Sequence, residues 1–355
     1  MEICHIVASK KEDFYGNKED ILSNVFGIDL GTSNIKIYNK DGDSLTVEKN
    51  MIAIENKTNV FAYGNSAYEM YEKAPDKIKI TYPLNSGVIA DIEHMETLIK
   101  LFITDQMKGQ TKPCEVYIAV PKDVTDVESR AFHDLINDAG IKAKKIMKVR
   151  KPLADGLGMN VDVMNSQGVL VVNVGYDTTE ISILSLKGIV ISKLIKVGGK
   201  KFDDAIRNVI RKEFSLIIGE KTAEHIKMSL KDLEKAGEDA VVYGRDIVTG
   251  LPVERSIPTD LIDQCLIESF DQILDNIKAT LERTPPELAA DIFKHGLYLT
   301  GGASQVCHLA QRLSNGVGLN VNLAENPLSS VALGLGKIIK DDQYKALAYS
   351  VEEDV

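Results

Sequence analysis

The chain has 355 residues, which suggests about two domains with a core in each. Apolar residues make up 44% and charged residues 26%, as is usual for a globular protein. The formal net charge is −10. An acidic chain gains little from releasing phosphate counterions, so this composition argues against nucleic-acid binding.

Cysteine usage and hydropathy favour a reduced compartment inside the cell. The four cysteines, at positions 4, 114, 265 and 307, form no C-x-x-C pair, and their spacing suits neither a zinc site nor a disulfide framework. No apolar run approaches the roughly 18 residues of a membrane span. Residues 1–25 carry charges without the apolar centre of a signal peptide, so we expect an N-terminal extension and a cytoplasmic protein.

The first half of the chain alternates strand and helix patterns. A strand pattern over 25–29 leads through a turn at 31–34 into an alternating strand over 35–38. The further expected elements are short strands with a helix (66–73) within 46–83, a helix at 94–106, a strand at 115–120, a helix at 126–139 capped by Gly140, a strand at 145–149 and a helix begun by Pro152.

The pattern then starts again. We expect strands at 168–174, 180–186 and 189–197, helices at 202–213, 223–234 and 260–283, a strand at 296–299, a helix at 306–313 and a last apolar helix at 329–339. Residues 29–34 can also be laid on residues 173–178, an offset of 173 − 29 = 144. Two such hairpins facing each other could grip a phosphate chain from both sides, although two unrelated hairpins would give the same echo.

The first hairpin has the chemistry of a phosphate loop. A polyphosphate needs converging backbone N–H donors and a tight turn without bulky side chains, which Gly31, Thr32, Ser33 and Asn34 supply. Asp29 stands where a carboxylate could hold Mg²⁺, usually through water. A plain surface hairpin is the alternative, since the motif is short.

Three later segments allow two interpretations each. The turn at 301–304 follows a strand and precedes a helix, where its N–H groups could meet a nucleoside or nothing at all. The Gly-Gly pair at 198–199 before a helix is equally ambiguous. Glu224 and Lys227 share a helix face at i, i+3, where an exposed ion pair is the ordinary outcome.

The order of these pieces is more specific than any one of them. Hairpin, proline-started helix, second hairpin, Gly-Gly helix, Glu-x-x-Lys helix and Gly-Gly turn resemble, in this order, the ATPase superfamily of actin, sugar kinases and heat-shock chaperones. Within it, residues 26–340 are most similar to the bacterial actin homologues of the MreB family, the rod shape-determining proteins. The matching segments are 27–34 (GIDLGTSN), 87–91 (GVIAD), 197–206 (VGGKKFDDAI), 222–227 (TAEHIK), 285–291 (PPELAAD), 299–302 (LTGG) and 324–328 (AENPL).

The resemblance implies an α/β fold of the actin-like ATPase type. Two related domains would each carry a small subdomain, with ATP and Mg²⁺ in a cleft between them. The implied boundaries are 26–47, 84–165 and 321–345 for the core of domain I, 48–83 for its small subdomain, 166–200 and 266–320 for the core of domain II, and 201–265 for its small subdomain.

The resemblance also implies roles for single residues. The first hairpin would touch phosphate from one side and the second from the other, Glu224 and Lys227 would lie along the ribose and adenine, and the turn at 301–304 would flank the adenosine. The expected cofactor-binding residues are Gly31, Thr32, Ser33, Asn34, Gly175, Tyr176, Asp177, Thr178, Gly198, Gly199, Glu224, His225, Ile226, Lys227, Gly301, Gly302, Ala303 and Ser304. Asp29 is the expected metal ligand and Thr178 the expected catalytic residue.

Three departures from the family pattern fall at the reacting end. Asn173 stands in place of an aspartate and cannot supply negative charge for magnesium. Tyr176 and Asp177 replace glycines of the second phosphate loop, and Lys151 replaces the glutamate that positions the attacking water. Because phosphoryl transfer depends on positioning and charge compensation, we hypothesise that nucleotide binding survives while hydrolysis is weakened. Lys151 could compensate by pairing with Asp177 or by replacing part of the cation's charge, and neighbours could also restore an ordinary ATPase.

The implied function is an ATP-binding cytoskeletal protein that assembles with itself into paired protofilaments and guides wall synthesis at the inner membrane face. The alternatives are a non-hydrolysing scaffold or regulator and, with less support, a sugar-kinase-type phosphotransferase. Direct membrane binding is doubtful because Met107 is the only apolar residue in the loop 107–113 and the leader is not basic. Contact would then be made through membrane-bound cell-wall synthesis proteins, or the chain would not bind the membrane at all.

Overall fold

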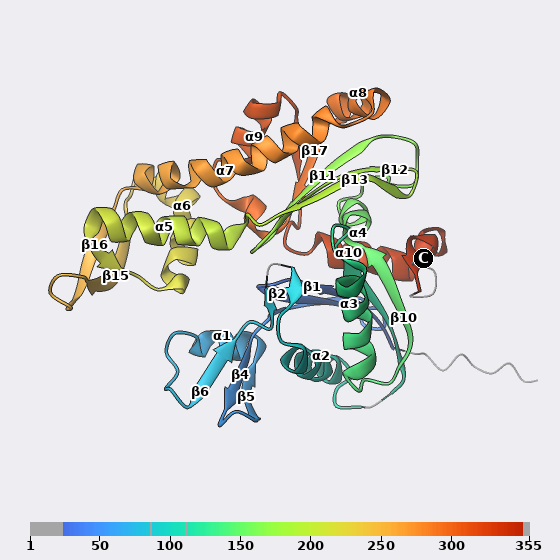
Figure 1. The fold of residues 1–355 in the computed structure, drawn as a ribbon, viewed down its shortest axis with the longest axis horizontal. Coiled ribbons are helices and arrows are strands. Elements are labelled where there is room, and N and C mark those ends of the chain that lie inside the picture. The colour runs from blue at the N-terminus through green and yellow to red at the C-terminus, as the bar shows by residue number, and fades with distance from the viewer. Residues whose placement is uncertain (1–23, 86, 111, 351–355) are drawn as a thin grey trace, which may run out of the picture.

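The computed structural model describes residues 24–85, 87–110 and 112–350. Two large sheets with helices around them dominate the ribbon in Figure 1. The expected N-terminal extension lies outside the described residues, apart from positions 24 and 25, which already belong to the first strand. The α/β fold class is confirmed.

The first large sheet has the strand order β19-β10-β9-β1-β2-β3. Its strands are β1 (Asn24–Leu30), β2 (Asn34–Asn39), β3 (Ser44–Lys49), β9 (Cys114–Val120), β10 (Ala143–Arg150) and β19 (Ala348–Tyr349). The helices packed on it are α2 (Ile92–Gln106), α3 (Asp126–Asp138), α4 (Lys151–Gly158) and α10 (Ser330–Lys340). Strand β1 is buried on both faces, since Phe26 and Ile28 share a core with α2 and α3 while Gly27 lies against Leu335 of α10.

The second large sheet has the strand order β13-β12-β11-β17-β18. Its strands are β11 (Val169–Val174), β12 (Thr179–Ser185), β13 (Gly188–Ile195), β17 (Leu297–Thr300) and β18 (Val321–Leu323). The helices of this half are α5 (Gly199–Phe214), α7 (Thr259–Glu282), α8 (Pro286–His295) and α9 (Leu309–Val317). Phe202 of α5 and Phe270 of α7 meet edge to face in the core beneath the sheet.

The two sheets repeat one topology. In each, a run of antiparallel strands is followed by strands parallel to the first of the run: β9 and β10 for β1, β17 and β18 for β11. Asp29 pairs in register with Lys36, and Asn173 pairs with Glu180. Both members of the second pair are displaced by 144 positions (173 − 29 and 180 − 36), so the internal echo seen in the sequence is confirmed.

Helices α4 and α10 join the two halves. Leu157 of α4 and Leu335 of α10 belong to one apolar cluster with Val149 of the first sheet and Val171 of the second. Gly334 makes the close approach possible, because a Cβ there would lie 1.8 Å from the Ala154 carbonyl oxygen. The ends of β1 and β11 are therefore held in a fixed relation to the start of α4.

Each half carries a smaller sheet, and Figure 1 shows both on the same side of the molecule. One is formed by β4 (Ile52–Glu55), β5 (Asn59–Tyr63) and β6 (Ile78–Thr81) with helix α1 (Gly64–Met70). The other is formed by β14 (Leu216–Ile217), β15 (Ala240–Asp246) and β16 (Pro252–Ile257) with helix α6 (Glu220–Ala236). A short hairpin, β7 (Leu84–Asn85) and β8 (Val88–Ile89), leads into α2.

Some expected elements differ from the structure. The helix expected at 306–313 is wrong in its first turn: a 3₁₀ turn, η1 (Gly302–Gln305), comes first, and α9 begins only at Leu309. The cause is His308, whose φ of 64° is left-handed and incompatible with a continuous helix. Helix α8, the β15–β16 hairpin and the second 3₁₀ turn, η2 (Asp342–Leu347), have no counterpart in the sequence prediction.

The loop after α2 presents little apolar surface. Met107 is 7% exposed and packs in the core of the first half. Among the described residues, no helix has the length and apolar content needed to cross a membrane.

Candidate functional site

The first hairpin loop is held in shape by Asn50. The Gly31 N–H donates to the Asn34 carbonyl (3.1 Å), which closes the tight turn. Fully buried Asn50 then donates its side-chain amide to the Gly31 carbonyl (3.0 Å) and its backbone N–H to the Ser33 carbonyl (2.9 Å). The loop carbonyls are thus satisfied within the protein, which fixes the orientation of the peptide planes between them.

The second hairpin lies against the Gly-Gly pair before α5. The Gly175 N–H donates to Thr178 (2.8 Å), and the Gly199 N–H donates to the Gly175 carbonyl (3.0 Å). A Cβ at Gly198 would lie 2.6 Å from the carbonyl oxygens of both Gly175 and Tyr176, so only glycine fits there. The structure therefore brings together these two predicted segments, which the sequence separates by about twenty residues.

The turn after β17 packs on the same hairpin. Gly301 has a φ of 91°, and a Cβ there would lie 2.3 Å from the Val174 carbonyl oxygen and 2.5 Å from the Asn173 side-chain oxygen. The buried Ser304 hydroxyl donates back to the Gly301 carbonyl (2.7 Å). A Cβ at Gly199 would come 3.3 Å from Ala303, so all three glycine segments of the second half converge.

The predicted Glu-x-x-Lys pair is not an exposed ion pair. Lys227 is 8% exposed and forms an ion pair with Asp203 of α5 (2.8 Å). Glu224 instead reaches the other half of the molecule, where it contacts Lys49 (3.4 Å) and accepts a hydrogen bond from the Tyr68 hydroxyl (2.5 Å). Lys49 also approaches the Ser33 hydroxyl (3.4 Å), which links α6 to the first hairpin loop.

His225 and Ile226, which lie between Glu224 and Lys227, differ in their exposure to solvent. The Ile226 side chain is 3% exposed and belongs to the core of the second half, and His225 is exposed. Of the four predicted positions on α6, the structure therefore brings Glu224 and Lys227 to the other site segments.

The predicted metal ligand, Asp29, is neutralised by two lysines. Its carboxylate is 3.0 Å from Lys36 and 3.7 Å from Lys151, the first residue of α4. Burial would raise the pKa of the Asp29 carboxyl, but the two ammonium groups outweigh burial and hold the pKa below its usual value. Asp29 is therefore ionised, with each oxygen next to a cation.

A second buried carboxyl, Asp155, holds Asn173. The Asn173 amide donates to one Asp155 oxygen (2.7 Å) and the Ser330 hydroxyl donates to the other (2.6 Å). Burial raises the pKa of Asp155 to about 6, although Lys151 and these two hydrogen bonds oppose the shift. The negative charge that an aspartate would bring to position 173 is thus carried by Asp155 of α4, the hydrogen-bond partner of Asn173.

Glu180 is the third carboxyl near Lys151. It is 5% exposed, accepts from the Lys122 N–H (3.1 Å), and has its pKa raised to about 7, chiefly by burial, while Lys151 opposes the shift. Burial also disfavours the charge of Lys151 itself, yet the nearby carboxylates raise the pKa of Lys151 above its usual value. An ammonium ion therefore stands among Asp29, Asp155 and Glu180.

This arrangement does not fit a magnesium ion at Asp29. Magnesium demands oxygen ligands in a near-ideal octahedron, and a lysine ammonium is a donor without a lone pair to offer. Both Asp29 oxygens already face ammonium groups, and Asn173 turns its amide toward Asp155. The charge that a divalent ion would supply is carried here by Lys36 and Lys151.

Several contributors were missed by the sequence analysis. Asn50 and Tyr68 lie in the segment treated only as an insert, and Asp155 lies inside the expected helix begun by Pro152. A signal existed only for Asp155, since an acid on the apolar face of a short helix is costly unless it is paired. The contacts of Asn50 and Tyr68 depend on tertiary packing alone.

Two sheets of one topology, joined by α4 and α10 and with glycine turns at the ends of β1, β11 and β17, define an actin-like ATPase fold. The chain belongs to the MreB/Mbl family, whose description is "MreB/Mbl protein" and whose profile matches residues 23–346. The chain is 36% identical to the cell shape-determining protein Mbl of Bacillus subtilis over 317 residues, covering 88% of this chain and 95% of that protein. It is 34% identical to the cell shape-determining protein MreB of Escherichia coli K12 over 329 residues, covering 90% and 94%.

Solved structures agree with this assignment. MreB5 of Spiroplasma citri bound to AMPPNP superposes with a TM-score of 0.84 at 34% identity and covers 92% of this chain and 98% of that chain. The same protein has also been solved with ADP, again with a TM-score of 0.84. The MamK double helical filament, at 20% identity and a TM-score of 0.74, shows the shared fold alone.

Proposed function

We propose that the chain is a nucleotide-binding cytoskeletal protein that polymerises into filaments and contributes to cell shape by organising wall synthesis. Its relatives are named as cell shape-determining proteins, and a relative of 34% identity has been solved with both AMPPNP and ADP. The observation that carries nucleotide binding is the convergence of the glycine segments around Gly175, Gly198 and Gly301, where three turns without side chains approach one another closely at one place.

The site that we propose keeps the residues expected from the sequence. Gly31 to Asn34 would bind phosphate from the first half and Gly175 to Thr178 from the second. The nucleoside would be surrounded by the segments 198–199, 224–227 and 301–304. The Ile226 side chain is buried in the core, so this residue would contribute through its backbone. The domain boundaries remain part of the proposal, with one adjustment. Strand β3 belongs to the first large sheet, so the first core segment extends to Lys49 instead of ending at residue 47.

Weak hydrolysis is the second part of the proposal. The resemblance assigns a glutamate where this chain has Lys151, and the Lys151 ammonium lies 3.7 Å from Asp29 among buried carboxyls. A protonated lysine cannot accept a proton from water, so the position cannot serve as a base at neutral pH. Magnesium that arrives with ATP would be held by the phosphates and water, and its expected binding to Asp29 stays an untested prediction that the two lysines argue against.

The location of the filaments in the cell is proposed from the family. We propose assembly in the cytoplasm, with any attachment to the inner membrane face made through membrane-bound cell-wall synthesis proteins. The burial of Met107 supports this view, because the loop after α2 then offers no apolar anchor among its described residues. A non-hydrolysing scaffold is the second candidate, and Lys151 is the observation that favours it.

One experiment separates these functions. Purified full-length chain is sedimented with ATP, with AMPPNP and without nucleotide, the pellets are imaged by electron microscopy, and released phosphate is measured in parallel. Filaments that depend on nucleotide and release little phosphate are the expected result. Nucleotide binding without any polymer would contradict the filament function and favour the scaffold, and turnover of a small phosphoryl acceptor would favour a phosphotransferase.

A further inference from the structure

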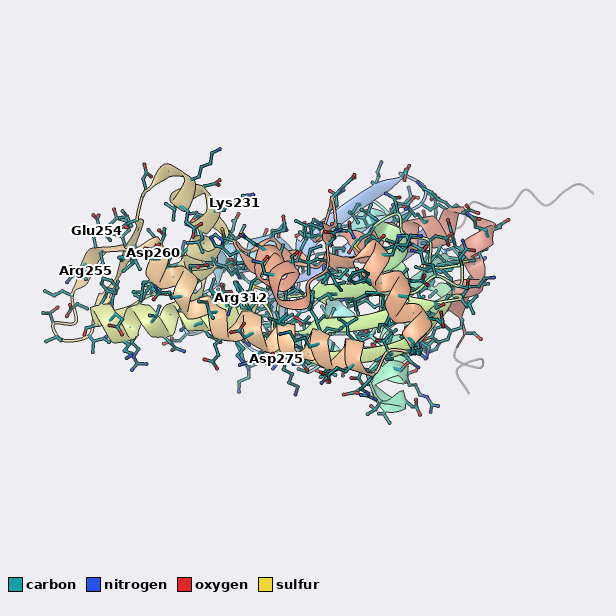
Figure 2. All side chains as sticks on the ribbon, turned by 90° about the horizontal axis from the view of Figure 1, so that it is seen from above. Lys231, Glu254, Arg255, Asp260, Asp275 and Arg312 are labelled. Atoms are coloured by element: carbon teal, nitrogen blue, oxygen red, sulfur yellow. The ribbon has the colours of Figure 1, made fainter. Side chains whose placement is uncertain are left out.

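Three side chains with metal-binding chemistry meet beside the candidate site. Glu234 lies in the last turn of α6, and Cys307 and His308 follow the 3₁₀ turn η1 just before α9. The Cys307 thiol donates to Glu234 Oε2 (3.3 Å), and His308 Nε2 lies 2.7 Å from the same oxygen. Figure 2 labels two residues near this cluster: Lys231 lies in α6 about one turn before Glu234, and Arg312 lies in α9 about one turn after His308.

The geometry points to one bound Zn²⁺ ion, held by Glu234, Cys307 and His308. Thiolate, imidazole and carboxylate are the three side-chain ligands that zinc prefers. Their ligand atoms lie within 4.8 Å of one another. Metal–ligand lengths of about 2.0–2.3 Å place the ligand atoms of a tetrahedral site somewhat under 4 Å apart, so small side-chain shifts suffice to close the site.

The surroundings supply the charge that such a site needs. Asp263 of α7, a further carboxylate, and His308 line one hollow of about 430 Å³. Arg312 interacts with Asp263 as well, but its guanidinium is held by Asp271 through two hydrogen bonds of 2.8 Å each. The Glu234 carboxylate and the nearby Asp263 favour a dication electrostatically, and water can complete the coordination.

A coordinating thiol loses its proton, so an ion bound here would replace the hydrogen bond that the Cys307 S–H donates to Glu234 by metal–ligand bonds to both side chains.

The position of the site gives it a consequence. Glu234 belongs to the helix that carries Glu224 and Lys227, whereas Cys307 lies three residues beyond the turn at 301–304. A metal bridging the two would fix α6 relative to that turn. This consequence rests on the proposed nucleotide site, but the binding of zinc itself does not. Cysteine spacing could not reveal the site, because only one cysteine contributes and its partner carboxylate is 73 positions earlier.

Cobalt substitution gives a direct test. Full-length reduced protein is titrated with Co²⁺, and we expect visible bands of a tetrahedral ion together with a near-ultraviolet thiolate-to-cobalt charge-transfer band. Cys307→Ser should abolish the charge-transfer band, and Glu234→Gln should weaken binding more than about tenfold. Cys265→Ser is the matched control, because it removes the partly buried thiol of α7 and should leave both signals unchanged.

A stability measurement guards against variants that fail to fold. Stoichiometric Zn²⁺ should raise the Tm of the wild type and leave that of Cys307→Ser and of His308→Gly unchanged. His308→Gly is informative because glycine suits the φ of 64° at this position, so the imidazole is lost without backbone strain. Absence of a charge-transfer band in the wild type, or a band that persists in Cys307→Ser, would overturn the proposal, whereas loss of the zinc effect on Tm in both Cys307→Ser and His308→Gly supports it.

Discussion

At the scale of single residues, Lys151 determines the charge of the candidate site. Its ammonium group lies 3.7 Å from Asp29, whose other oxygen is 3.0 Å from Lys36. Buried charges are tolerated when they are paired, and here two cations and the surrounding carboxyls satisfy one another without any added ion. A nucleotide entering this site would meet the ammonium groups of Lys36 and Lys151 already in place.

The first prediction concerns the magnesium dependence of nucleotide binding. Because Lys36 and Lys151 supply fixed positive charge, the affinity for a fluorescent ATP analogue should change by less than about tenfold, or about 1.4 kcal/mol, between Mg²⁺ and EDTA. Lys151→Glu should make binding depend on Mg²⁺, with affinity in EDTA lowered by more than about tenfold. Fluorescence titrations of both proteins measure this.

The matched control is Lys145→Glu, which makes the same charge change at an exposed position of β10. It should bind as the wild type does with and without Mg²⁺. A wild-type affinity that collapses by a factor of about a hundred or more in EDTA would refute the internal-cation interpretation, while failure to bind under any condition would instead refute the nucleotide site.

The second prediction concerns pH. The pKa of Glu180 is raised to about 7 and that of Asp155 to about 6, both mainly by burial, so the folded chain binds more protons than the unfolded chain below those values. The free energy of unfolding should therefore fall as pH rises from 6 to 8. Glu180 alone accounts for about 1 kcal/mol over this range, equivalent to about 2 °C in Tm.

Thermal unfolding of Glu180→Gln tests this assignment. Glutamine keeps an oxygen that can accept from the Lys122 N–H but does not titrate. The slope of Tm against pH between 6 and 8 should flatten in this variant. An unchanged slope would assign the pH dependence to other groups, and a rise in wild-type Tm with pH would contradict the prediction outright.

The sequence could identify loops more readily than contacts. Gly31 to Asn34, Gly198 and Gly301 were found because a glycine at a turn leaves a local pattern. Asn50 and Tyr68 could not be found, since what matters is which distant backbone or side chain they meet after folding.

At the scale of elements, buried strands were predictable and exposed ones were not. The apolar runs of β1, β9 and β11 are buried on both faces and leave an unbroken signal. The β15–β16 hairpin exposes Tyr243 and alternates weakly, and so it was missed. The break before α9 was also missed, because nothing in the local pattern shows that His308 adopts a left-handed conformation.

The turn between β17 and η1 gives the third prediction. Gly301→Ala would place a Cβ 2.3 Å from the Val174 carbonyl oxygen and would also strain a φ of 91°. We expect a loss of about 2–4 kcal/mol in the free energy of unfolding, from clash and backbone strain together. Denaturant unfolding followed by circular dichroism measures it.

Gly318→Ala is the matched control for this turn. Gly318 has a φ of 69°, and a Cβ there would meet no neighbouring atom within 4 Å, so only backbone strain of about 1 kcal/mol is expected. Equal losses in the two variants would show that the close approach of the 301–304 turn to β11 contributes nothing to stability.

At the scale of the whole molecule, the two halves are linked by more than the shared helices. Glu224 of α6 contacts Lys49 and Tyr68 across the halves, and the Tyr71 hydroxyl donates to Glu220 (3.0 Å). These contacts connect the two small subdomains, which lie on the same side of the molecule in Figure 1. The relative position of the halves is therefore coupled to the residues proposed to meet the nucleotide.

The fourth prediction is that ATP and AMPPNP support filaments of equal lifetime. In an actin-like polymer, hydrolysis matters because it replaces ATP by ADP within the filament and so changes the conformation of the subunit. With Lys151 in place of a base, that replacement should be slow, and filaments assembled with either nucleotide should decay alike after dilution. Light scattering and sedimentation at successive times after dilution measure the decay.

The matched variant reverses two of the three departures from the family pattern at once. In Lys151→Glu combined with Asn173→Asp, hydrolysis should rise, and filaments assembled with ATP should decay faster than those assembled with AMPPNP. If the charge of Lys151 limits hydrolysis, wild-type filaments should decay at the same rate with ATP and with AMPPNP. Wild-type filaments that decay several times faster with ATP than with AMPPNP would show instead that other residues activate the attacking water, and that the cation at position 151 leaves the nucleotide cycle intact.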